Sequence, residues 1–126
     1  MKINVWSYKN EYKSIREKIL KEVDKVFSSG RLILGNNVKS LESNFSKYLK
    51  LKYGIGVNSG TDAIQIALMS AKIGKGDEVI TAPNTAVPTV SAIVSCGAKP
   101  IFVDINKEDY LIDVSKIEEA ISKKTK

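Results

Sequence analysis

Apolar residues recur at steps of three and four through the first 50 residues of the chain. Between residues 9 and 28, this stripe comprises Tyr12, Ile15, Ile19, Leu20, Val23, Val26 and Phe27. Because that spacing places the side chains on one face of a helix, we expect an amphipathic helix that ends at Ser29-Gly30. A second helix is predicted over about 37–49, capped by Asn36 or Asn37, with its inward face formed by Val38, Leu41, Phe45 and Leu49.

After residue 50 the pattern changes, and short apolar runs alternate with segments of helical spacing. Strands are predicted at 54–57, 78–82 and 100–105, and helices at 61–72, 86–96 and 114–122, the last one capped by Asp113. Strand–helix–strand units with continuously apolar strands indicate a parallel sheet covered on both faces. The predicted fold class is therefore α/β, with a helical N-terminal segment over 1–52 and the start of the α/β core over 53–126.

The turn from Asn58 to Asp62 joins the first predicted strand to its helix. In one interpretation it is an ordinary turn, in which Ser59 or Thr61 caps the helix and Gly60 permits the bend. In the other it binds a phosphate group, because the first amides of a helix lack internal partners and point along the positive end of the helix dipole. The residues alone leave both interpretations open.

Several other motifs are incomplete. No stretch matches the G-x-x-x-x-G-K-[ST] pattern, and a near match to G-x-G-x-x-G at Gly54 and Gly56 has Ser59 in the third position. Segment 104–115 carries oxygen donors like those of a calcium loop, but Asp109 replaces the turn glycine and Ser115 the final glutamate. We therefore predict no metal site and no nucleotide site of these kinds.

Composition narrows the chemistry further. The chain has no histidine, which excludes Ser/His/Asp and Cys/His catalysis and zinc sites of the Cys/His kind. Its net charge is +6, but most lysines alternate with acidic residues, as on a solvated helix face, so we expect no nucleic-acid partner. No apolar run suits a membrane span, and the single cysteine, Cys96, is expected to be a buried thiol in a cytoplasmic protein.

Four segments occur in the order and spacing of one enzyme family. They are EYKSIREKILKEVDKVFSSGRLILGNNVKSLESNFSKYL, GVNSGTDAIQIAL, IGKGDEVITAPNTAVPTVSAI and GAKPIFVDINKEDYLIDVSKIEEAISKKTK. In them the chain resembles the N-terminal part of the DegT/StrS family of pyridoxal-phosphate-dependent sugar aminotransferases. The resemblance implies part of a fold-type I large domain, pyridoxal 5'-phosphate as cofactor, and amino transfer from glutamate or glutamine to a nucleotide-linked keto sugar.

The resemblance also implies roles for particular residues. Gly60, Thr61 and Asp62 match the turn that holds the cofactor phosphate. The segment PNTAVPT matches the stretch over the cofactor ring, where many members carry an aromatic side chain. This chain has Ala86 there, beside Asn84, and alanine cannot stack on a ring. Finally, Gly30-Arg31-Leu32 resembles a loop near the substrate entrance, so Arg31 and Leu32 are predicted to contact substrate.

In the family, the lysine that forms the Schiff base, the acidic residue facing the pyridine nitrogen and the C-terminal small domain lie downstream of the matched segments. No lysine of this chain has the matching context, so no catalytic residue is predicted in it. We expect the chain to be the first part of a longer enzyme and to be inactive by itself. We also expect it to form a homodimer or a higher oligomer. The alternatives are a sugar dehydratase of the same family and a non-catalytic remnant or assembly fragment.

Overall fold

The computed structural model describes residues 6–126, which divide between two compact units, Met1–Gly56 and Val57–Lys126. None of the helices in this described part of the chain is both long and apolar enough to cross a membrane.

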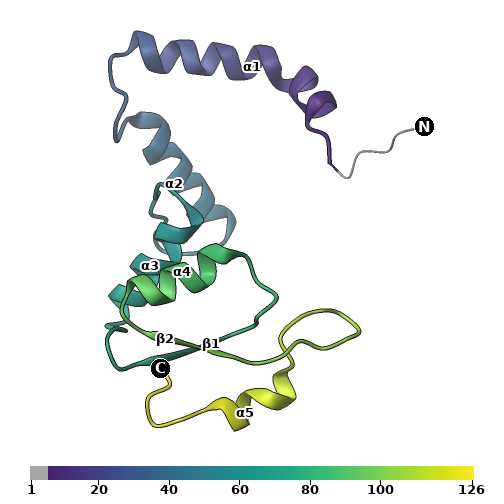
Figure 1. Ribbon diagram of the computed structural model, residues 1–126. Coiled ribbons are helices and arrows are strands. Elements are labelled where there is room, and N and C mark those ends of the chain that lie inside the picture. Colours follow the sequence, from purple (N-terminus) through teal and green to yellow (C-terminus); the bar gives the residue numbers. More distant parts are fainter. Residues whose placement is uncertain (1–5) are drawn as a thin grey trace, which may run out of the picture. The chain divides into compact units, whose positions relative to one another are not determined.

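The first unit contains two helices, as predicted: α1 (Lys9–Ser28) and α2 (Asn36–Tyr48) (Figure 1). The predicted end of α1 is confirmed, because Ser29 is its C-cap and Gly30 follows with φ of 66°, a left-handed conformation that glycine adopts without strain. The apolar stripe of α1 is mostly exposed, since none of its residues is buried and only Ile15 and Val26 are half-buried.

The predicted cap of α2 is wrong. The N-cap is Gly35, in an extended conformation and without a side-chain hydrogen bond. Asn36 and Asn37 already lie in the first helical turn. A capping side chain acts from the residue before the helix, so starting the helix one residue earlier removes both asparagines from that role.

The strand predicted at 54–57 is also wrong. These residues form no strand, and no other strand among residues 6–126 pairs with them. The N–H of Gly56 instead donates to Glu42 Oε1 at 2.8 Å. Gly54 lies so close to α2 that a Cβ there would be 2.6 Å from the carbonyl oxygen of Glu42. A side-chain carboxylate has thus taken the place of a neighbouring strand.

The second unit has the predicted order of elements: α3 (Gly60–Ser70), β1 (Glu78–Thr81), α4 (Val87–Ser95) and β2 (Lys99–Phe102). The strands β1 and β2 pair in parallel, with Glu78 opposite Lys99 and Thr81 opposite Phe102, which confirms the predicted parallel sheet. On the free edge of β1, Glu78 forms an isolated parallel bridge with Thr125. β1 therefore has a hydrogen-bonded neighbour on each side.

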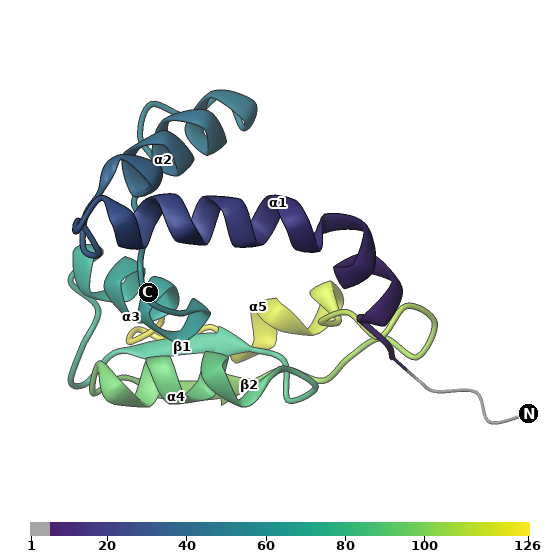
Figure 2. The ribbon, with the colours of Figure 1, turned by 90° about the horizontal axis from the view of Figure 1, so that it is seen from above.

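Helices cover the two faces of this strand pair. The helices α3 and α4 pack together on one face, and α4 contacts β2 (Figures 1 and 2). The buried apolar residues of the described chain gather in this region: Ala92, Ile93, Ala98 and Val103. The core of the unit is therefore the contact of α4 with the start and end of β2.

The helix predicted at 114–122 is shorter than expected. It consists of a 3-10 turn, η1 (Val114–Lys116), and a single turn, α5 (Ile117–Ala120), on the opposite face of the strand pair in Figure 1. The predicted cap is confirmed, because Asp113 Oδ1 accepts from the N–H of Ser115 at 3.1 Å. The Ser115 hydroxyl and the Lys116 ammonium also bond this carboxylate and hold its pKa below the ordinary value.

Candidate functional site

The turn that the sequence predicts to bind a phosphate lies at the start of α3. Ser59 is the N-cap, with an extended backbone (φ −154°, ψ 165°), and Gly60 and Thr61 are the first two helical residues. No acceptor within residues 6–126 takes the N–H of Gly60 or of Thr61. Because α3 is eleven residues long, these amides stand at the positive end of a full helix dipole.

The amide of Asp62 differs from its two neighbours. It donates to Ser59 Oγ at 3.1 Å, and Ser59 Oγ in turn bonds Asp62 Oδ2 at 2.9 Å. The first bond is that of a capping box, but the Asp62 carboxylate accepts from the Ser59 hydroxyl rather than from the Ser59 N–H. Together the two bonds tie the start of the helix to the residue before it. The Ser-x-x-Asp spacing is visible in the sequence and could have indicated that the Asp62 amide is already in use.

The space beside Gly60 is open. A Cβ built on Gly60 meets no atom within 4 Å, and the residue as a whole is exposed. The hydroxyl of the half-buried Thr61 makes no hydrogen bond within the described chain. The turn therefore offers two free amides, one free hydroxyl and room for a tetrahedral anion, which is the donor set that phosphate groups prefer.

The other residues assigned to the cofactor lie on the connection between β1 and α4. Asn84 is exposed, and Ala86 is the N-cap of α4 without a side-chain capping bond. Between them, the half-buried Thr85 shares a hydrogen bond with Thr89, with 3.0 Å between the two hydroxyl oxygens. This hydroxyl pair was not predicted, and only the i,i+4 spacing of two threonines at a helix start could have indicated it.

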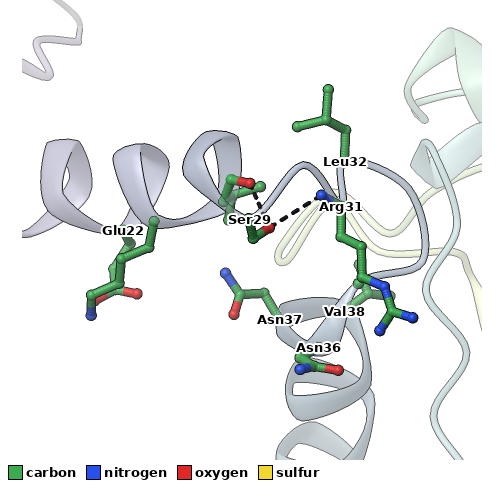
Figure 3. A pocket seen from close by; sticks show the side chains of 10 residues that line it. Glu22, Ser29, Arg31, Leu32, Asn36, Asn37 and Val38 are labelled. Atoms are coloured by element: carbon green, nitrogen blue, oxygen red, sulfur yellow. Dashed lines mark hydrogen bonds and ion pairs between the residues drawn. The ribbon is translucent and has the colours of Figure 1, made fainter.

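Arg31 and Leu32 belong to the first unit and line a hollow of about 220 Å³ between the end of α1 and the start of α2 (Figure 3). Figure 3 shows their side chains leaving the loop in opposite directions. The guanidinium of Arg31 forms no ion pair with any of residues 6–126, whereas Glu22 on the same wall pairs with Lys25 at 2.6 Å. The hollow is smaller than the roughly 300–1,000 Å³ of complete small-molecule sites, so it suits one charged group of a larger ligand.

In the calcium-like segment 104–115, side-chain oxygens already accept hydrogen bonds from the backbone. Asp104, Asn106 and Asp109 each accept a nearby backbone N–H at 2.8–2.9 Å. Residues 6–126 contain no group of three His, Cys, Asp or Glu side chains placed to hold a metal ion. Cys96 is half-buried, with its sulfur 3.6 Å from the carbonyl oxygen of Gln65.

Comparison with known proteins identifies the chain's relatives. The model of the DegT/DnrJ/EryC1/StrS aminotransferase family matches residues 13–126. A curated relative, the dTDP-3-amino-3,4,6-trideoxy-alpha-D-glucose transaminase of Micromonospora megalomicea subsp. nigra, is 48% identical over 97% of this chain and 33% of its own length. The chain thus spans about a third of the length of this curated relative.

Solved structures agree with the fold. DesV of S. venezuelae superimposes with a TM-score of 0.90 at 33% identity, over 95% of this chain and 32% of that one. NtdA of Bacillus subtilis, solved with bound cofactor PMP, has a TM-score of 0.86 at 40% identity, over 90% of this chain and 26% of that one. These neighbours support the prediction that the helices and the parallel strand pair are part of a fold-type I domain.

Proposed function

Because the chain belongs to the DegT/DnrJ/EryC1/StrS aminotransferase family, we propose that it forms the N-terminal part of the cofactor-binding large domain of a sugar aminotransferase. The cofactor is pyridoxal 5'-phosphate, which solved members of the family carry in its PLP or PMP form. In this proposal the turn at the start of α3 holds the cofactor phosphate.

The observation that carries the proposal is the pair of free amides at Gly60 and Thr61 beside an open space. Together with the Thr61 hydroxyl they supply three donors to a phosphate, and the helix dipole adds about 0.3–1 kcal/mol. In this proposal Asp62 has a structural role rather than the phosphate-binding role expected from the resemblance. Its amide and carboxylate are both bonded to Ser59, so it orders the turn rather than donating to the phosphate.

When bound, pyridoxal phosphate supplies an electron sink that lets an amino group move between an amino acid and a keto group. The residues of this chain contribute binding and orientation. Gly60 and Thr61 would hold the phosphate, and Asn84 and Ala86 would lie beside the ring. Since Ala86 offers only a methyl group, its contact with the ring would be small, and the bonds to the phosphate would supply more of the affinity than in a site with an aromatic residue there.

The names of the relatives support a proposal for the substrate class. The Micromonospora protein is named for an amino sugar linked to dTDP, so we propose a nucleotide-linked keto sugar as acceptor and glutamate or glutamine as donor. We further propose that Arg31, whose guanidinium forms no ion pair among residues 6–126, binds an anionic group of the substrate. The lysine that reacts with the cofactor and the small domain are proposed to lie in sequence beyond the matched third.

The test uses the protein as its organism produces it. Its intact mass, its content of pyridoxal phosphate and its transfer of nitrogen from glutamate to a dTDP-linked keto sugar are measured on one preparation. We expect a mass about three times 13.9 kDa, one cofactor per chain and an amino sugar product. A protein of 13.9 kDa that retains no cofactor would instead support the non-catalytic alternative, and loss of a hydroxyl without gain of nitrogen would support the dehydratase.

A further inference from the structure

Three aromatic side chains cluster just before and within the first turn of α1. The rings of Trp6 and Tyr8 lie parallel, with 6.2 Å between centroids and 7° between planes. The ring of Tyr12 follows at 6.3 Å from that of Tyr8, tilted by 34°. None of these residues belongs to the proposed cofactor site, so the proposed function does not explain the cluster.

The cluster is open to solvent. Trp6 is 78% exposed, and Tyr8 and Tyr12 are 38% and 39% exposed. Together with Ser7 and Lys9, the three rings line a hollow of about 350 Å³, which falls in the size range of small-molecule sites. Exposed apolar surface that is gathered into one hollow marks a binding site more often than isolated exposed residues do.

The shape and charge of the hollow select a planar, anionic ligand. Two parallel rings present flat faces, and any nucleobase can stack on such a face because every base has a π-face. Lys9 also lines this hollow, and its ammonium group forms no ion pair within residues 6–126. An aromatic ring joined to a phosphate is the chemistry of a nucleotide.

We propose that the aromatic cluster of Trp6, Tyr8 and Tyr12, together with Lys9, binds the nucleotide part of the sugar substrate, the rings stacking on the base and the ammonium pairing with phosphate. The choice of a nucleotide-linked ligand rests on the proposed function. The site itself rests on the arrangement of these four side chains, and it is separate in sequence from the cofactor turn at Gly60 and Thr61.

Trp6 is the single tryptophan of the sequence and reports directly on the site. In the protein as its organism produces it, the emission of Trp6 is obtained as the difference between the wild type and W6L. Titration with dTDP should quench this emission saturably at concentrations up to about 1 mM, the usual upper range for substrates. Pyrophosphate and glucose 1-phosphate, which have no base, should leave it unchanged.

Calorimetry of dTDP binding adds a second measurement. W6L should bind roughly tenfold more weakly, or worse, because one stacking partner of the base is lost. The matched control is Tyr110→Leu, which removes an aromatic ring of similar exposure (65%) outside the cluster and should leave the affinity unchanged.

The inference is overturned if dTDP does not change the Trp6 emission, if glucose 1-phosphate quenches it equally, or if W6L and the Tyr110 variant bind dTDP alike. A Trp6 emission that depends on protein concentration without nucleotide would assign the cluster to contact with a second copy of the chain instead. Cofactor content, measured by its own absorbance, separates the two proposals. Saturable quenching by dTDP in a protein that cannot hold pyridoxal phosphate would reject the aminotransferase function and keep the nucleotide site.

Discussion

Replacing Gly60 by proline removes one proposed phosphate donor and changes little else. Proline has no N–H, and the first helical position is where a helix tolerates it, because the amide there has no internal partner. The preceding residue must be extended, and Ser59 already is, with φ −154° and ψ 165°. The chain itself places Pro88 in the first turn of α4. The variant should therefore fold and still lack the amide.

The expected loss can be estimated from the bond that disappears. A hydrogen bond to a charged group contributes about 1.5–3 kcal/mol, and each 1.4 kcal/mol is a factor of ten in affinity. Gly60→Pro should therefore weaken the binding of pyridoxal phosphate roughly 10- to 150-fold. The bonds from Thr61 remain, so binding should be weakened rather than abolished.

The matched control is Gly60→Ala. It adds the same Cβ, which meets no atom within 4 Å, but keeps the N–H. Both variants are made in the protein as its organism produces it, and cofactor dissociation constants are measured by absorbance titration after dialysis against an amino-group donor. Far-ultraviolet circular dichroism confirms that each variant is folded. Equal dissociation constants for the proline and alanine variants would refute the assignment of the Gly60 amide to the phosphate.

Three further predictions concern stability. Ser59→Ala removes the cap of α3 and should lower the free energy of unfolding by about 1 kcal/mol in urea denaturation, whereas an unchanged midpoint would contradict the capping role. Gly54→Ala places a Cβ 2.6 Å from the Glu42 carbonyl oxygen and should lower the free energy of unfolding by about 1–3 kcal/mol. Gly56→Ala, whose Cβ has its nearest contact at 3.4 Å, should lower it clearly less. Similar losses for the two variants would argue against the close approach. The pKa of Asp113 in the folded chain lies below the unfolded value of 3.8. The bonds to its carboxylate therefore contribute fully to stability above pH 3.8, and this contribution is lost as the pH falls through the folded pKa. The helical signal of the η1–α5 region should fall over that acid range in the wild type and not in Asp113→Asn.

Elements with a strong local signal could be predicted from the sequence. The α1 helix has its predicted bounds because seven apolar residues repeat at helical spacing and Ser29-Gly30 ends them. The parallel pair β1–β2 was predicted from two apolar runs separated by a helix. In both cases the deciding residues lie close together in the chain.

The failures have a different origin. Residues 54–57 are as apolar as a strand, but a strand also needs a neighbouring strand, and here the carboxylate of Glu42 accepts the Gly56 amide instead. Nothing in the four residues themselves indicates a partner at position 42. The inward face predicted for α2 is likewise wrong for three of its four residues, since Leu41, Phe45 and Leu49 are 62%, 56% and 46% exposed. Periodicity shows that a face is apolar and not what covers it.

At the candidate site, the sequence predicts the turn but not which of its amides are already hydrogen-bonded within the chain. The resemblance assigns Gly60, Thr61 and Asp62 together to the turn that holds the cofactor phosphate. The reciprocal bonds between Ser59 and Asp62 separate a structural residue from two free donors. Which amide is free depends on the rotamer of one serine side chain, and residue types alone do not determine a rotamer.

The boundary between the two compact units has a consequence for how such a protein can evolve. It falls after Gly56, so all residues assigned to the cofactor belong to the second unit, while Arg31, Leu32 and the aromatic cluster assigned to the substrate belong to the first. If the proposed assignments hold, mutations in residues 6–56 that alter the choice of sugar or base leave the residues proposed to anchor the phosphate unchanged. Under these assignments, duplicated genes of such a chain can acquire new acceptors while inheriting the same cofactor chemistry unchanged.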